Sequence, residues 1–410
     1  MILALAWCAF VGIHAVPAAA SGRFDPHCLL QSRVQRSSSL WEQLEVEDRT
    51  SAGFFEFYTF STQRSSHDAF WTDIASWTAN FERFANALTQ DLSLSADNPW
   101  LPSGCEVFMF RTTDEIATKT LKHLPPLSET SGPGRVVLVL NEEHQSGEEV
   151  WALLQPELRA QDKVVILGNK WNATHANLED GRVSSLWVPC ASLLFVAHSK
   201  STPMDLVSAP PSRAVYNTVA YQQHDCNPFR EQVWDRLNEM LDSEFQVHGA
   251  QLSTCNGDNH AGVNMSGVVP DGSHEDWDTS VNRLASFKFA LTAENDINND
   301  IGYISEKIID ALLAGIVPIY AGSLDILQMI NPDRFILLKG DETDEEQLRL
   351  VMALVQDPIR YAAMRSKPAI VSDEAMRQFF SWHPSVWPRY GDSLRQRIVG
   401  SLARQCKAST

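Results

Sequence analysis

A short predicted helix opens with two opposite charges, Glu306 and Lys307, at a place where they could bind a ligand. Ser305 suits the N-cap of this helix, and Gly315 suits the left-handed position after its last turn. A lysine in the first turn faces the positive end of the helix dipole and is mildly unfavourable. A bound diphosphate would account for it, because phosphate oxygens accept bonds from helix N–H groups and from an ammonium.

Glu306 has a second possible use, since a carboxylate can accept hydrogen bonds from the two adjacent hydroxyl groups of a ribose. The simpler alternative is that both side chains are solvated and that Lys307 pairs with Asp310 one turn later.

Two buried strands flank this helix and must position it. They are predicted at 287–292 and 316–320, from short apolar runs rich in β-branched and aromatic residues. In open parallel sheets ligands bind at the carboxyl ends of the strands, where the loop before Ser305 begins. The charges of the helix therefore face the expected ligand side.

The rest of the chain repeats the same strand–helix alternation on both sides of a Pro- and Ser-rich linker at 201–213. Before the linker we predict strands at 136–140, 163–168 and 193–197, and helices at 66–92 and 148–160. After it we predict strands at 214–221 and 244–249, and helices at 228–241 and from the capping box Thr343–Glu346 to Gln356.

The fold class that this pattern indicates is α/β, with two Rossmann-like βα domains facing across a cleft. We expect a leader at 1–20, an N-terminal acceptor-side domain at 21–205, a nucleotide-sugar-binding domain at 214–395 and a tail at 396–410. A chain of 410 residues is long enough for two cores.

The charge balance restricts the partners. The formal net charge is −18, from 33 basic and 51 acidic residues, so the chain lacks the basic excess that sequence-independent nucleic-acid binding needs. A local basic pocket for a diphosphate remains compatible with this balance.

The first twenty residues are apolar and end in small residues, which favours a cleaved signal peptide; an uncleaved signal anchor is the alternative. Two glycosylation sequons begin at Asn172 and Asn264, and six cysteines remain after the leader, which permits disulfides. We expect the secretory pathway, most simply the Golgi lumen, with the membrane contacted only through the N-terminal anchor.

The segment 286–323 resembles the donor-binding motif of the α-1,3-fucosyltransferases, glycosyltransferase family 10. That family shows a strand ending near Glu-Asn, a variable loop, Tyr-(Ile/Val)-(Thr/Ser)-Glu-Lys and Ala-Gly-x-x-Pro-(Ile/Val). The matching residues here are Glu294-Asn295, Tyr303-Ile-Ser-Glu-Lys307 and Ala314-Gly-Ile-Val-Pro-Ile319. A weaker likeness covers 219–230 and ends at Arg230.

The resemblance implies a GT-B fold and GDP-fucose as donor, without a tightly bound cofactor. It implies that Arg230 and Lys307 bind the phosphates and that Asn295, Tyr303 and Glu306 surround the ribose and sugar. The simpler alternative for Arg230 is an exposed arginine at a helix start. The acceptor would be a glycan or glycoprotein, and neither it nor the linkage follows from the motif.

Inverting transfer needs a base near the acceptor hydroxyl group. The strand at 136–140 runs into Glu142 and Glu143, at the edge that faces the expected cleft. We favour Glu142 as the base and rank Glu143 second, with Glu179-Asp180 lower; a solvated acidic turn is the alternative.

No pattern requires a metal. Asp276-Trp-Asp278 spells the D-x-D metal motif of another transferase architecture, but the motif is short and lies in a predicted polar loop at 252–280, so we predict no metal site. Two readings compete with a GDP-fucose-dependent transferase. They are a non-catalytic nucleotide-sugar or glycan-binding protein with a degenerate base, and a transferase for another nucleotide sugar.

Overall fold

The computed structural model describes residues 50–51, 55–60, 83–88, 105–112, 135–141, 145–159, 162–171, 181–221, 227–252, 263–264, 277–295, 297 and 301–407. All of them belong to one compact unit, Asp48–Thr410. The predicted leader, the sequon residue Asn172 and most of the helix predicted at 66–92 lie outside the described residues. Within that predicted helix, residues 83–88 are helical.

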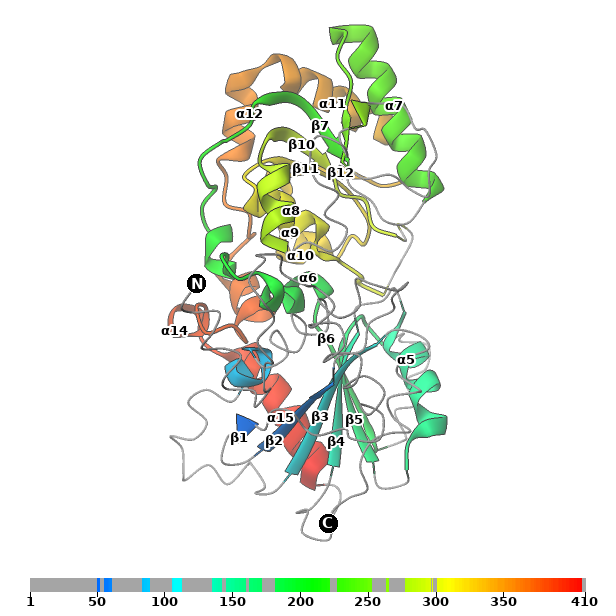
Figure 1. Ribbon diagram of the computed structural model, residues 1–410, viewed down its shortest axis with the longest axis vertical. Coiled ribbons are helices and arrows are strands. Elements are labelled where there is room, and N and C mark those ends of the chain that lie inside the picture. Colours follow the sequence, from blue (N-terminus) through cyan, green and yellow to red (C-terminus); the bar gives the residue numbers. More distant parts are fainter. Residues whose placement is uncertain are drawn as a thin grey trace, which may run out of the picture. The chain divides into compact units, whose positions relative to one another are not determined.

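In the first sheet the described residues form six strands, in the order β1-β2-β3-β4-β5-β6 (Figure 1). Among these strands only the β1–β2 pair is antiparallel. Its strands are β1 Thr50–Ser51, β2 Phe55–Phe60, β3 Cys105–Thr112, β4 Arg135–Asn141, β5 Asp162–Gly168 and β6 Val183–Trp187. β4 and β5 confirm the strands predicted from their continuous β-branched runs, which are buried on both faces.

The second sheet is parallel throughout, in the order β12-β11-β10-β7-β8-β9. Its strands are β7 Tyr216–Tyr221, β8 Ala250–Gln251, β9 Val263–Asn264, β10 Phe287–Leu291, β11 Val317–Ala321 and β12 Ile336–Leu338. The predicted α/β class, with two sheets that are parallel apart from the β1–β2 pair, is thereby confirmed.

Helices connect the strands and cover the sheets. The α-helices are α5 Gly147–Leu154, α6 Cys190–Leu193, α7 Pro228–Phe245, α8 Trp277–Leu284, α9 Glu306–Leu313, α10 Ile326–Met329, α11 Asp344–Gln356, α12 Pro358–Arg365, α13 Asp373–Ala375, α14 Trp387–Tyr390 and α15 Ser393–Lys407. Short 3₁₀ turns occupy Gln155–Glu157, Leu194–Ala197, Pro203–Leu206 and Pro332–Arg334, and η7 Met376–Phe380 is a π-helix.

Three local predictions were wrong. The strand predicted at 193–197 is helical, because it continues α6 into a 3₁₀ turn. The strand predicted at 244–249 is the end of α7 and the loop that follows, and pairing begins only at Ala250. α11 forms where predicted, but Thr343 makes no capping bond; its hydroxyl group donates to Asp341 instead.

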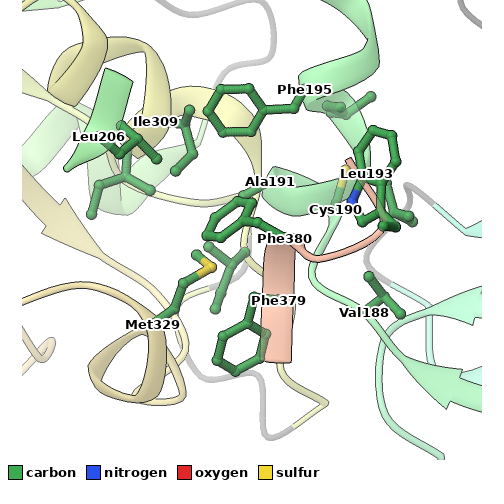
Figure 2. Packing of buried hydrophobic residues seen from close by; sticks show 14 of the residues in the cluster. Val188, Cys190, Ala191, Leu193, Phe195, Leu206, Ile309, Met329, Phe379 and Phe380 are labelled. Carbon is green, nitrogen blue, oxygen red and sulfur yellow. The ribbon is translucent and has the colours of Figure 1, made fainter. Parts of the chain in front are cut away.

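The two sheets share a hydrophobic core. One buried cluster includes Leu138 and Val165 from the first sheet and Ile309 from α9 beside the second. Figure 2 shows its central part, where side chains of α6, α9, α10 and η7 meet. A second cluster fills the other face of the second sheet, against α7 and α11.

The predicted tail forms most of α15, which packs on β4, β5 and β6 of the first sheet (Figure 1). Cys406 near its end is disulfide-bonded. Otherwise the predicted domain boundaries stay a prediction. In the described part of the chain, no helix combines the length and apolarity that a membrane crossing needs.

Candidate functional site

The candidate site is centred on the tripeptide Ala293–Asn295, which follows β10. The Nε of Arg230 donates to the carbonyl oxygen of Ala293 at 2.9 Å, and its guanidinium also donates to the side chain of Asn295. Asn227, the N-cap of α7, donates to the carbonyl oxygen of Asn295 at 2.6 Å. Arg230 is only 2% exposed, so it is not the exposed helix-start arginine of the simpler alternative.

Glu294, the middle residue, binds the start of α9. One carboxylate oxygen accepts from the backbone N–H of Ser305 at 2.8 Å, and the other lies 3.9 Å from Nζ of Lys307. Lys307 also donates to the hydroxyl group of Ser305 at 3.0 Å and lies 3.8 Å from the Glu306 carboxylate. Arg230 and Lys307 therefore attach to consecutive residues of one strand end.

Burial sets the electrostatics of this strand end. Glu294 is fully buried, which raises the pKa of its carboxyl group, and the ammonium of Lys307 opposes this. Tyr320 of β11 lies beside it, and burial followed by the nearby Glu294 raises the pKa of its hydroxyl group. A Cβ at Gly322 would lie 2.5 Å from both side chains, so glycine leaves room for them.

The remaining residues of the motif differ in exposure. Tyr303 is buried, with 6% of its surface exposed, whereas the side chains of Glu306 and Lys307 are 26% and 24% exposed. Ser305 takes the N-cap position by its backbone, but its hydroxyl group makes no cap bond. Gly315 has the predicted left-handed backbone, with φ of 74°. The roles of Tyr303 and Glu306 toward a ribose or sugar stay predictions.

The predicted bases Glu142 and Glu143 lie outside the described residues, as do Glu179 and Asp180. Both ends of the segment that carries Glu142 and Glu143 are described. Asn141, at the end of β4, and Asn169, after β5, each donate to the carbonyl oxygen of Gln145 at 2.8 Å. These two bonds place Gln145 at the carboxyl ends of two adjacent strands, the edge at which the sequence predicts the base.

The second aspartate of the D-x-D sequence lies in the first turn of α8, not in the predicted loop, and it has a structural role. The Asp278 carboxylate accepts from the backbone N–H groups of Ser199 at 3.0 Å and Lys200 at 3.1 Å. Buried His198 lies 3.8 Å from Asp278 and 3.4 Å from Asp310, so it joins α8 to α9. Within the ranges described above, no group of three or more His, Cys, Asp or Glu residues has a metal-binding arrangement.

Sequence reasoning missed the parts played by Tyr320 and Asn227. Asn227 preceded Pro228 at a predicted helix start, which is a capping signal, but its bond to the Asn295 backbone has no signature in sequence. Tyr320 was placed only in a buried strand, and its hydroxyl group beside Glu294 depends on the pairing of β10 with β11.

Residues 235–366 match the family model described as glycosyltransferase family 10 (fucosyltransferase) C-terminal region. This range contains Glu294, Asn295 and the whole motif from Tyr303 to Ile319. The resemblance to glycosyltransferase family 10 is therefore confirmed for this region of the chain.

Among curated proteins, GDP-fucose protein O-fucosyltransferase 3 of Bos taurus is 36% identical over 81 residues, which are 20% of this chain and 16% of that protein. The chain thus matches only about a sixth of that relative. An α1,3-fucosyltransferase crystal structure aligns over 73% of this chain and 78% of its own, with 16% identity and a TM-score of 0.41. An α-glucosyltransferase bound to UDP-glucose and DNA aligns over 83% and 90%, with 12% identity and a TM-score of 0.42. TM-scores this low establish no shared fold, so the fold rests on the topology described above.

Proposed function

We propose that the protein is an inverting glycosyltransferase that moves fucose from GDP-fucose to a hydroxyl group of a glycan or glycoprotein. The observation that carries the proposal is the placement of Arg230 and Lys307. Both bind the strand end Ala293–Asn295, at the carboxyl edge of a parallel sheet, in and just before the part that matches the fucosyltransferase family.

In this proposal the two cations bind the diphosphate of the donor and offset the charge that builds on GDP as it leaves. Glu306, partly exposed beside Lys307, accepts from the ribose hydroxyl groups, and Asn295 and Tyr303 line the sugar side. The bond between the sugar and the phosphate oxygen breaks with its electron pair going to GDP.

Glu142, or else Glu143, removes the proton of the acceptor hydroxyl group as its oxygen attacks the sugar from the opposite face. Support comes from Gln145, the next described residue after Asn141, which Asn141 and Asn169 hold at the carboxyl edge of the first sheet. No metal enters these steps. A protein acceptor is favoured by the name of the curated relative, and residence in the secretory pathway by the apolar N-terminus.

A donor panel tests the proposal. GDP-fucose and GDP should raise the melting temperature, since a ligand at about 100 times its Kd stabilises the native state by about 2.7 kcal/mol. GDP-mannose, UDP-sugars and CMP-sialic acid are measured in parallel as alternative donors. A shift with a UDP-sugar but none with GDP-fucose would mean that the donor is that UDP-sugar and not GDP-fucose.

A release assay then separates transfer from binding. GDP release in the presence of acceptor glycoproteins should fall at least about a hundredfold in Glu142→Gln, as expected when a general base is lost. If Glu142→Gln and Glu143→Gln both keep full activity, the base lies elsewhere. Tight GDP binding by the wild type without any release would favour a non-catalytic binding protein.

A further inference from the structure

The segment 301–304, directly before Ser305, is bound by the first sheet through its carbonyl groups. The oxygen of Ile301 accepts from the backbone N–H of Lys170 at 2.7 Å, and that of Ile304 accepts from the N–H of Ala191 at 2.8 Å. The oxygen of Gly302 accepts from Nε1 of Trp187 at 3.1 Å. Three of four consecutive carbonyl groups thus bind a residue that follows β5, the last residue of β6 and a residue of α6.

An ion pair reinforces this attachment. Nζ of Lys170 lies 2.6 Å from Oδ2 of Asp325, in the loop after β11, and 4.7 Å from the ring centroid of Trp187. Asp325 is itself held, because its Oδ1 accepts from the side-chain N–H of Gln328 at 2.7 Å and its Oδ2 also accepts from the hydroxyl group of Ser323 at 3.2 Å. Lys170 therefore holds loops on both sides of α9 at once.

Glycine is required at the centre of the contact. Gly302 has φ of 73°, and a Cβ there would lie 2.7 Å from Nε1 of Trp187 and 3.1 Å from Asp325. The Trp187 ring can approach this backbone so closely only because glycine has no Cβ.

The donor residues are packed against the hydrophobic core. Ala191 belongs to α6, whose side chains pack in the cluster shown in Figure 2 with Phe379 and Phe380. Trp187 makes an edge-to-face contact with Phe379, with centroids 5.4 Å apart. The 301–304 segment thus rests on a preformed surface.

We propose that Lys170 and Trp187 are positioning residues for the nucleotide: they fasten the 301–304 segment so that Glu306 and Lys307 are held ready for the diphosphate and ribose. This rests on the proposed function. The physical reason is that a segment already fixed loses little conformational entropy when ligand binds, and that apparent affinity falls with the fraction of molecules in the competent state.

Calorimetry with GDP tests the proposal on the full-length protein. Trp187→Phe keeps an aromatic ring, although a smaller one, but removes the indole N–H, and Lys170→Ala removes the ion pair. Each should raise the Kd for GDP by about fivefold, the factor that corresponds to one ordinary hydrogen bond. Lys170→Arg should recover most of the affinity. In a double-mutant cycle, Lys170→Ala with Asp325→Ala should weaken binding no more than either single change.

Kinetics and a matched control distinguish positioning from general stability. The KM for GDP-fucose should rise with the Kd while the KM for acceptor stays within about twofold of wild type. Lys367→Ala removes another Lys–Asp pair, 2.5 Å from Asp333 and far more exposed, and should leave the Kd for GDP unchanged. A lower melting temperature with wild-type GDP affinity in Lys170→Ala and Trp187→Phe would overturn the inference.

Lys307→Ala separates the two proposals. If it abolishes GDP binding while Lys170→Ala and Trp187→Phe bind normally, the donor site stands and the positioning role fails. If Lys307→Ala also binds GDP normally, the donor site itself is wrong. Lys170 is 35% exposed, so Lys170→Ala carries the test should Trp187→Phe not fold.

Discussion

At the scale of single residues, the candidate site is a buried polar junction whose groups hold one another. Arg230 has both a ligand role in the proposal and a structural role in the fold, because its guanidinium binds Ala293 and Asn295. A loss of activity on replacing Arg230 would therefore not by itself distinguish the ligand role from the structural role.

Arg230→Ala should therefore reduce both stability and GDP affinity. Removing a charged donor from a buried site should cost about 1.5–3 kcal/mol of the free energy of unfolding, and GDP affinity should fall more than tenfold. Urea unfolding and calorimetry measure the two effects. Arg236→Ala, which removes an exposed ion-pair residue of the same helix, is the control and should change both little. Wild-type GDP affinity in a folded Arg230→Ala would remove this residue from the phosphate site.

Glu294 predicts a pH effect of definite sign. Burial raises the pKa of its carboxyl group in the folded protein. At pH values above the ordinary glutamate pKa, the native state therefore binds more protons than the unfolded state. The free energy of unfolding should thus fall as pH rises from about 4.5 toward the raised pKa. Burial also raises the pKa of the Asp310 carboxyl group, which makes the free energy of unfolding fall with pH in the same way.

Glu294→Gln should flatten the part of this fall that Glu294 causes. Denaturant unfolding of wild type and variant between pH 4 and 8 gives the difference between their free energies of unfolding at each pH. The contribution of Asp310 is the same in both proteins and cancels from this difference. A difference that does not change with pH would mean that Glu294 titrates normally in the folded state.

At the scale of elements, the turn after α9 lies against Pro210, in the segment that the sequence predicts to be a linker. Gly315→Ala should destabilise the protein by about 1–2 kcal/mol, because φ of 74° is strained for alanine and the new Cβ would lie 2.8 Å from Pro210. Chemical unfolding measures this. Gly181→Ala, whose Cβ would meet nothing within 4 Å, is the control. Equal stabilities of the two variants would show that the turn relaxes.

The elements around α9 could be predicted because several signals agreed there: continuous β-branched runs, an N-cap residue and a C-terminal glycine. The apolar run at 193–197 was too short to separate strand from helix, and strand was the wrong choice. Strand β12 has only three residues, below what periodicity detects. The bonds from Lys170, Trp187 and Ala191 to 301–304 join distant parts of the chain and have no local signature.

At the scale of the whole molecule, the C-terminal helix returns to the first sheet. The four-residue spacing of Leu394, Ile398, Leu402 and Cys406 was a readable sign of a buried helix face, although we treated 396–410 as a tail. Arg395 adds a bond from α15 to the carbonyl oxygen of Leu88 at 3.1 Å. The second half of the sequence thus completes the core of the first.

Leu402→Ala tests whether this shared core makes folding one cooperative event. Leu402 is fully buried, so its loss should cost about 2–5 kcal/mol of the free energy of unfolding and lower the melting temperature by several degrees. Differential scanning calorimetry should show one transition, moved as a whole, with the upward shift on adding GDP retained because the candidate site lies at the other sheet. Arg397→Ala, exposed on the same helix, should leave the transition in place. Two separate transitions in Leu402→Ala, of which only the later one responds to GDP, would show instead that the first sheet unfolds independently of the second.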